Sequence, residues 1–325
     1  MIFAGCSGCS PSYKKISREE LLEFAREGAT KSAELVIKSH LSLAGASGKT
    51  GLYYDRNNNE WYQPAGLAPS THILKQSHVR LKKIVANEQL CLLTARKLGI
   101  RTSDSFIINL NDKENDFLFA TERYDRKILD TSKELMGKKV PLRLHQEDFA
   151  QALGITASQK YEKNGKDYLA DAFELIKNYS SNPIEDQIRL WDLCIFNYLI
   201  GNTDNHVKNI ALLYSEDLKG IRLAPAYDLL STVIYDSSTE KMSLNIDGEY
   251  DIRNINQKSF ENEAKKLGLG KGIATQHFLS MVEKFEMALE QSTYELEEQG
   301  YGVAVDIQKK ILKKAGIHNF KLTNP

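Results

Sequence analysis

Residues 199–214 read Leu-Ile-Gly-Asn-Thr-Asp-Asn-His-Val-Lys-Asn-Ile-Ala-Leu-Leu-Tyr, and they place Asp204 five residues before Asn209. The apolar end of this stretch, a polar turn over 215–220 and residues 221–223 predict a short hairpin. That hairpin leads into Ala224-Pro-Ala-Tyr-Asp228, which ends on a second carboxylate. Two carboxylates and one amide therefore come from neighbouring loops, and oxygen ligands of this kind suit Mg²⁺.

The interval from Asp204 to Asn209 is the one found in the catalytic loop of protein kinases. In that loop the aspartate accepts the proton of the attacking hydroxyl, and the asparagine holds a metal ion. One short loop has to present both groups, because both act on the same phosphoryl group. We therefore predict that Asp204 is a catalytic base and that Asn209 and Asp228 bind the Mg²⁺ of an ATP complex.

Two further side chains of this loop are candidates for catalysis. Lys208 is expected to neutralise the charge that develops on the transferred phosphoryl group. His206 has two open interpretations: it orients Asp204, or it packs as an ordinary buried histidine.

The 325-residue chain is 42% hydrophobic and 26% charged, with a formal net charge of zero. This length allows one large bilobal domain or two ordinary ones. Zero net charge gives no general attraction to nucleic acid, and no apolar run reaches the ~18 residues of a membrane span. Without a signal-peptide pattern, we expect a cytoplasmic protein that binds neither nucleic acid directly nor membrane.

The four cysteines fall into two groups. Cys91 and Cys194 lie in apolar helical patterns and are expected to be buried thiols. Cys6 and Cys9 form a Cys-x-x-Cys, for which metal binding and a Gly/Ser-rich tail without metal are both open. The tail is favoured, because no second pair of cysteines follows.

A glycine-rich stretch, Leu43-Ala-Gly-Ala-Ser-Gly-Lys-Thr50, lies between two expected strands. It is not a Walker A motif, because residue 43 is leucine rather than glycine and no helix follows. A kinase-type phosphate loop, whose backbone amides donate to ATP, is favoured over a plain hairpin turn. The residues expected to contact ATP here are Ala44, Gly45, Ala46, Ser47, Gly48 and Lys49.

Two more positions before residue 126 are candidates for ATP binding. Lys75 lies inside an apolar strand, where a kinase has the lysine that contacts ATP phosphates, and Glu88 is a candidate partner for it. The stretch Thr121-Glu-Arg-Tyr-Asp-Arg126 falls at the expected lobe junction, where backbone groups can bind adenine and Tyr124 can pack on the ring. A charged linker strand with solvated salt bridges is the alternative.

The distribution of patterns predicts an α+β chain with a strand-rich part over residues 1–125 and a helical part over 126–325. Residues 1–15 are expected to be a loose lead-in, and Ser17-Arg-Glu-Glu20 is a capping box that opens a helix to about Gly28. Expected strands lie at 37–43, 50–54, 61–62, 71–75, 105–110 and 116–121. Expected helices lie at 86–98, 146–153, 167–178, 183–200, 281–296 and 303–314, with Pro183 at a first turn.

The chain resembles the HipA family of bacterial toxin kinases over most of its length. Four stretches carry the resemblance, and each is read directly from this sequence: residues 42–50, Pro69-Ser-Thr-His-Ile-Leu-Lys75, residues 121–126, and the Gly201-to-Asn209 loop with Leu223-to-Leu230. Two shorter ones agree, at Asn87-Glu88 with Leu98-Gly99 and at residues 144–148 with Lys160-Tyr-Glu162.

The resemblance implies a bilobal, protein-kinase-like fold with a strand-rich N-lobe and a helical C-lobe. It implies that Asp204 is the base, that Asn209 and Asp228 bind Mg²⁺, that Lys75 holds ATP phosphates, and that Glu122 and Tyr124 lie at the adenine. It also implies a protein serine/threonine kinase that acts as the toxin of a toxin–antitoxin system. Its substrate would be a serine of an aminoacyl-tRNA synthetase, and a helix-turn-helix antitoxin would restrain it.

About forty residues precede the glycine-rich loop, fewer than in full-length HipA proteins. This departure resembles the shorter HipT branch, in which a separate small HipS-like protein supplies the N-terminal subdomain. Two rival functions stay open: a small-molecule kinase, and a non-catalytic nucleotide-binding module.

Ser42 matches the loop serine that the family autophosphorylates, and Ser47 is a second possible acceptor. A phosphate at Ser42 adds nearly two negative charges beside those of ATP. We predict that Ser42→Asp weakens ATP affinity, measured by calorimetry, whereas Ser42→Ala does not. Equal affinity for all three proteins would contradict this gating role.

Overall fold

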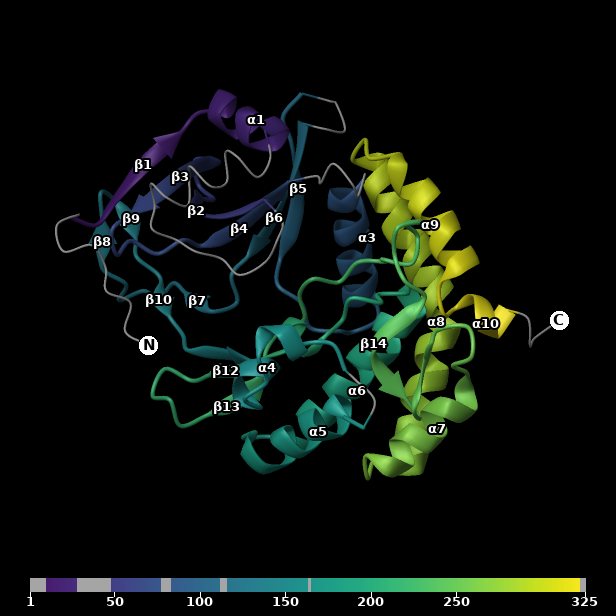
Figure 1. Ribbon diagram of the computed structural model, residues 1–325. Coiled ribbons are helices and arrows are strands. Elements are labelled where there is room, and N and C mark those ends of the chain that lie inside the picture. Colours follow the sequence, from purple (N-terminus) through teal and green to yellow (C-terminus); the bar gives the residue numbers. More distant parts are fainter. Residues whose placement is uncertain (1–9, 28–47, 77–82, 112–115, 163–164, 322–325) are drawn as a thin grey trace. The chain divides into compact units, whose positions relative to one another are not determined.

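The computed structural model describes residues 10–27, 48–76, 83–111, 116–162 and 165–321. The chain divides into two compact units (Figure 1). The first comprises residues 1–89 and 103–144, and the second comprises residues 90–102 and 145–325. Among the described residues, no helix is both long enough and apolar enough to cross a membrane.

The first unit is built on a six-stranded sheet in the order β1-β3-β2-β4-β6-β5. All neighbouring strands in this sheet are antiparallel. The strands are β1 (Ser12–Ile16), β2 (Lys49–Asp55), β3 (Glu60–Ala65), β4 (His72–Gln76), β5 (Ser105–Asn109) and β6 (Phe117–Glu122). The expected strand pattern from residue 50 to 121 is confirmed, whereas the expected loose lead-in over 12–15 is wrong, because these residues pair with β3. The strand expected at 37–43 lies outside the described residues.

Helix α1 (Arg18–Glu27) packs on this sheet through an apolar face. The expected capping box is confirmed: the Glu20 amide donates to Ser17 Oγ, and the Ser17 amide donates to the Glu20 carboxylate. Leu21 and Phe24 of the helix join Leu74 and Leu118 of the sheet in one core. The cap therefore fixes where the helix begins, and the apolar residues determine which side of the helix faces the sheet.

The first unit continues past residue 125, the expected end of the strand-rich part, to residue 144. Four two-residue strands lie there: β7 (Arg126–Lys127), β8 (Glu134–Leu135), β9 (Lys138–Lys139) and β10 (Leu142–Arg143). Tyr53 Oη donates to the Lys139 carbonyl and Arg143 donates to the Leu67 carbonyl, so this ribbon is bonded back to the sheet. Strands of two residues have no recognisable period, and the sequence gives little sign of them.

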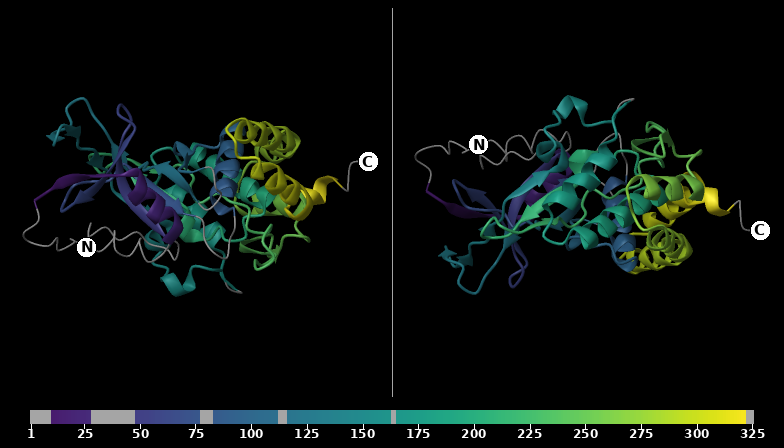
Figure 2. Two further views of the ribbon diagram at one scale, coloured as in Figure 1. Left: turned by 90° about the horizontal axis from the view of Figure 1, so that it is seen from above. Right: turned by 90° about the horizontal axis from the view of Figure 1, so that it is seen from below.

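The second unit is mostly helical. Its helices are α4 (Phe149–Ala152), α5 (Tyr168–Tyr179), α6 (Pro183–Ile200), α7 (Gln257–Lys266), α8 (Lys271–Glu298), α9 (Val303–Lys314) and α10 (His318–Lys321), and α3 (Ile84–Lys97) runs into it from the first unit. Its strands are β11 (Gln146–Asp148), β12 (Ala211–Tyr214), β13 (Ile221–Leu223), β14 (Lys241–Ile246) and β15 (Glu249–Asp251). Helices α8 and α9 lie side by side (Figure 2).

Most expected helices of this unit are confirmed, including 183–200 with Pro183 at its first turn and 303–314. The expectation of one helix over 146–153 is wrong for residues 146–148, which pair with β12 instead. Asp148 ends this strand and caps α4, since its carboxylate accepts the Gln151 amide. The buried thiols expected at Cys91 and Cys194 are confirmed, and the pair Cys6–Cys9 lies outside the described residues.

Helix α6 ends at Gly201, whose φ of 68° lies in the left-handed region. A side chain there would place Cβ 2.3 Å from Val233 Cγ1, so glycine is required by space as well as by backbone conformation. The candidate catalytic loop starts at the next residue.

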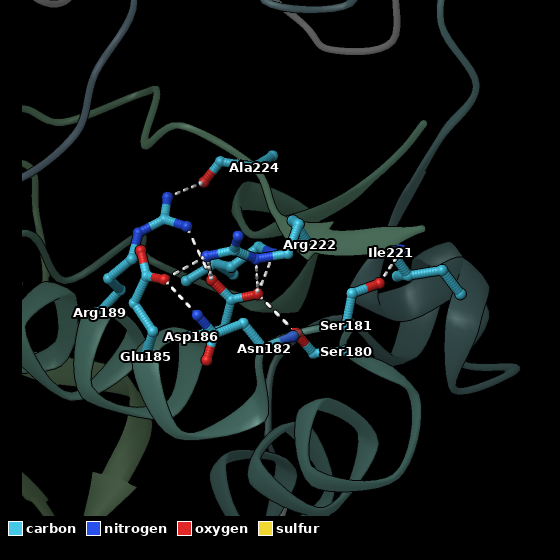
Figure 3. Close-up of polar contacts among 10 residues, drawn as sticks. Ser180, Ser181, Asn182, Glu185, Asp186, Arg189, Ile221, Arg222 and Ala224 are labelled. Carbon is cyan, nitrogen blue, oxygen red and sulfur yellow. Dashed lines mark hydrogen bonds and ion pairs between the residues drawn. The ribbon is translucent and has the colours of Figure 1, made fainter. Parts of the chain in front are cut away.

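The other end of α6 is held by the carboxylate of Asp186, which has no exposed surface (Figure 3). Arg222 and Arg189 donate to it, at 2.9 and 2.8 Å respectively. Ser180 Oγ and the Leu223 amide also donate, at 2.6 and 2.9 Å. A buried charge with this many donors ties α6, the turn before it and β13 into one assembly.

We predict that Asp186→Ala lowers the free energy of unfolding by about 3–5 kcal/mol, because two arginines lose their buried partner. Urea unfolding measures this. Glu185→Gln is the matched control: Glu185 pairs with Arg222 at 2.8 Å but is half exposed, so its loss should cost less than about 1 kcal/mol. Equal effects of the two substitutions would contradict the anchoring role.

Burial alone would raise the pKa of Asp186, but Arg222, Ser180 and the Leu223 amide outweigh burial and hold it below its ordinary value. The contribution of Asp186 to the free energy of unfolding is therefore complete above its unfolded-state pKa of about 3.9. It is lost as the pH falls below that value and through the lower pKa of the folded protein.

Candidate active site

The loop after Gly201 closes on itself through the Asp204 carbonyl. This oxygen accepts the amide of His206 at 2.9 Å and Asn209 Nδ2 at 3.0 Å. The side-chain nitrogen of Asn209 therefore bonds within the loop. Its side-chain carbonyl oxygen is the atom of this residue that would bind a cation. The Asp204 carboxylate remains 52% exposed, as a base that meets an incoming hydroxyl must be.

Asn202 connects this loop to Asp228. Its Nδ2 donates to Asn197 Oδ1 at 2.8 Å and to the Asp228 carbonyl at 3.2 Å, and its Oδ1 accepts the Asp204 amide at 3.3 Å. Because Asn202 is 1% exposed, these bonds are made away from water. The two predicted segments are therefore held together by the first residue of the loop itself.

The segment that carries Asp228 is fixed along its length. The Ala226 amide donates to the Arg101 carbonyl at 2.8 Å, and Tyr227 Oη donates to the Lys208 carbonyl at 2.8 Å. Asp228 itself has a φ of 53°, in the left-handed region that few residues other than glycine adopt. Strained backbone of this kind is concentrated at functional sites.

Lys208, expected to act on the phosphoryl group, pairs with Asp148 Oδ2 at 2.6 Å. Both side chains are largely buried, with 26% and 18% of their surface exposed. The lysine therefore joins the catalytic loop to the strand-to-helix junction at Asp148. Its role toward a phosphoryl group stays a prediction.

The His206 ring lies beside the Asp204 carboxylate without a hydrogen bond to it, since Nε2 is 4.0 Å from Oδ1. Its Nε2 instead lies 2.7 Å from Lys160 Nζ. Burial lowers the pKa of His206, and the Lys160 ammonium lowers it further against the opposing charge of Asp204. The ring is therefore neutral at pH 7. Nε2 accepts a hydrogen bond from the Lys160 ammonium, because an ammonium can only donate.

The neighbour of Lys160 reaches the predicted base directly. Tyr161 Oη donates to Asp204 Oδ1 at 2.7 Å. The motif Lys160-Tyr-Glu162 was visible in the sequence, but nothing in it indicates a contact with a residue 43 positions away. Asn202, Asp148 and Tyr161 are thus the site residues that the sequence pattern did not single out for a role.

In the first unit, Lys75 Nζ pairs with Glu88 at 2.7 Å. Both side chains are buried, with 16% and 6% exposed, so the expected partnership is confirmed as a strong ion pair. Lys49 lies directly opposite Lys75 across β2 and β4, and the Gly48 carbonyl accepts the Gln76 amide. The loop residues 44–47 and Ser42 lie outside the described residues.

The stretch at 121–126 is less exposed than a solvated linker. Arg123 and Arg126 both pair with Asp125, at 2.7 and 2.5 Å, and all three side chains are about nine-tenths buried. Glu122 is bonded to Arg56 at 2.8 Å, and Tyr124 is half-buried at the turn before β7. The alternative of solvated salt bridges therefore holds for Glu122, whose pair with Arg56 is exposed, and fails for the buried pairs of Asp125. The adenine contact stays a prediction.

No group of three or more His, Cys, Asp or Glu side chains in the described part of the chain forms a metal site. Asn209 and Asp228, the predicted ligands, would supply two oxygens. This fits Mg²⁺, which keeps several waters and is bound with substrate phosphates rather than in an all-protein cage.

The comparison with protein families matches residues 41–291 to the HipA-like C-terminal domain. The chain belongs to this family. The matched range contains all the candidate site residues, from Ser42 to Asp228.

Among curated relatives, the protein Y4mE of Sinorhizobium fredii is 33% identical over 243 residues, which cover 75% of this chain and 54% of Y4mE. The serine/threonine-protein kinase toxin HipA of Shewanella oneidensis is 27% identical over 262 residues, which cover 78% of this chain and 57% of HipA. The chain thus spans a little over half the length of these relatives.

Among solved structures, HipA from Shewanella oneidensis, in a complex with HipB and its operator DNA, matches with a TM-score of 0.73 at 22% identity. The match covers 96% of this chain and 73% of the HipA chain. The fold expected from the sequence, a mixed helix-and-strand fold like that of HipA, is confirmed.

We predict that Asn202→Ala lowers the free energy of unfolding by about 1–3 kcal/mol, since it leaves buried polar partners at Asn197 and Asp228 unpaired. Chemical denaturation measures the loss. Asn209→Ala is the control: it removes one bond at a more exposed position and should cost less. A larger cost for Asn209→Ala would contradict the bridging role of Asn202.

Proposed function

We propose that this protein is a Mg²⁺- and ATP-dependent protein serine/threonine kinase. One observation carries the proposal: a single loop presents the exposed Asp204 carboxylate and the Asn209 carbonyl oxygen, and Asn202 joins this loop to Asp228. In this assignment Asp204 accepts the proton of the acceptor hydroxyl, and Asn209 and Asp228 hold Mg²⁺ against the phosphates.

The phosphates of ATP would be contacted by residues of the first unit. The Lys75–Glu88 ion pair is the arrangement by which kinases fix a lysine toward phosphate. The amides of the glycine-rich loop from Ala44 to Lys49 would donate to the same phosphates, and Glu122 and Tyr124 would contact the adenine. ATP supplies the phosphoryl group, and the protein contributes position and charge.

The cellular role that we propose is that of a toxin in a HipBA- or HipBST-type toxin–antitoxin system. It is supported by the similarity to a relative named as a serine/threonine-protein kinase toxin, whose solved structure contains HipB and operator DNA. By analogy, the partners would be a helix-turn-helix antitoxin and, for a HipT-like protein, a HipS-like subunit. The substrate would be a cytoplasmic translation component such as an aminoacyl-tRNA synthetase.

We predict that Asp204→Asn lowers phosphoryl transfer by about a hundredfold or more, because the proton acceptor is lost. ATP binding should persist, because the metal and phosphate contacts stay. Peptide mass spectrometry after incubation with Mg-ATP measures transfer to Ser42 or Ser47, and calorimetry measures ATP binding.

Asp217→Asn, in the exposed turn between β12 and β13, is the control and should transfer phosphate like the parent protein. Full transfer by Asp204→Asn would exclude the assigned base. ATP binding without phosphate on the parent protein would leave either a kinase that modifies only its target or a non-catalytic nucleotide-binding module.

A further inference from the structure

Tyr161 occupies one of the two oxygens of the predicted base. Its hydroxyl lies 2.7 Å from Asp204 Oδ1, within the range in which a general base holds the proton that it abstracts. An acceptor serine or threonine needs a bond of the same kind to this carboxylate. Each carboxylate oxygen can accept more than one hydrogen bond, but no donor among the described residues bonds Oδ2, so Oδ2 is the oxygen that we assign to the acceptor.

The backbone under Tyr161 is anchored by the next residue, Glu162, which is 9% exposed. Its carboxylate accepts the amide of Asn245 at 2.8 Å and the Asn245 side chain at 2.6 Å. On the same strand, Ser243 accepts the Glu162 amide and donates from its hydroxyl to the Thr203 carbonyl at 2.6 Å. Strand β14 therefore bonds both the residue after Tyr161 and the residue before Asp204.

The ring of Tyr161 is supported from the side as well. It meets the ring of His206 edge to face, with 5.3 Å between the centroids. The Lys160 ammonium lies 4.7 Å from the centre of the Tyr161 ring and 2.7 Å from His206 Nε2. Two neighbouring residues, Lys160 and Tyr161, thus pack against two alternating residues of the catalytic loop, Asp204 and His206.

We propose that Tyr161 is a positioning residue: it fixes Asp204 by holding Oδ1 and so directs Oδ2 to the acceptor hydroxyl. This inference rests on the proposed kinase function. Burial and the Asp204 charge raise the pKa of Tyr161 to about 12, so the phenol remains a donor throughout the neutral range. A base held by a hydrogen-bond donor favours one rotamer, whereas an exposed aspartate without such a donor samples several.

The contact itself can be tested without any activity. Tyrosine labelled with ¹³C at Cζ reports the ionisation of each phenol by NMR. In the parent protein Tyr161 should titrate near pH 12, and in Asp204→Asn it should titrate at lower pH, because the neighbouring negative charge is gone. Titration of Tyr161 at the same pH in both proteins would overturn the proposal, whatever the protein catalyses.

The consequence for transfer is tested with Tyr161→Phe. We predict a rate of phosphate transfer at saturating Mg-ATP about tenfold below that of the parent, the loss expected for one hydrogen bond to a charged group. The Mg-ATP concentration at half-saturation and the thermal midpoint should not change. In the Asp204→Asn background the same substitution should have no effect on the residual rate.

Tyr214→Phe is the matched control, since Tyr214 Oη also donates to a carboxylate, Glu147, at 2.6 Å, in a strand beyond the catalytic loop. It should transfer phosphate at the parent rate. An unchanged or faster rate for Tyr161→Phe, or a slower rate with weaker ATP binding or a lower thermal midpoint, would overturn the positioning role. Absence of transfer in the parent with the NMR shift present would instead reject self-modification by this protein and leave the Tyr161–Asp204 contact standing.

Discussion

The geometry of the candidate site depends on the buried carboxylate of Asp186. It lies in the first turn of α6, and the two predicted catalytic segments begin from the elements that it joins. Helix α6, about 27 Å long for its 18 residues, ends at Gly201 and delivers the Asp204 loop. Strand β13, bonded to Asp186 through the Leu223 amide, continues into Asp228. One charge therefore sets the starting point of both segments, and Asn202 joins them again at the far end.

The sequence predicted the helix ends of α6 and the start of α1, where local signals mark them, but it missed α7 and placed the start of α8 at residue 281 instead of Lys271. Pro183 and Gly201 bracket α6, and Ser17 and Glu20 begin α1, because caps act over three or four residues. It failed at residues 146–148 and 12–15, which become strands only because a partner strand is supplied from elsewhere in the chain. Pairing over such distances overrides local propensity.

The site shows the same division between near and distant residues. The spacing of Asp204 and Asn209 was readable, because one loop has to present both groups. The partners of these groups come from far away: Tyr161 is 43 residues from Asp204, and Asp148 is 60 residues from Lys208. In the sequence, nothing distinguishes Tyr161 or Asp148 from other tyrosines and aspartates. Only the folded chain brings them to the loop.

Asp228 is a candidate site residue whose backbone lies in the left-handed region. Its φ of 53° is one that glycine adopts without steric penalty and that an aspartate adopts at a cost. Aspartate and asparagine enter this region more readily than other non-glycine residues, so a carboxylate can stand here at a modest backbone cost. The bond from Asn202 to the Asp228 carbonyl fixes the peptide that carries this conformation.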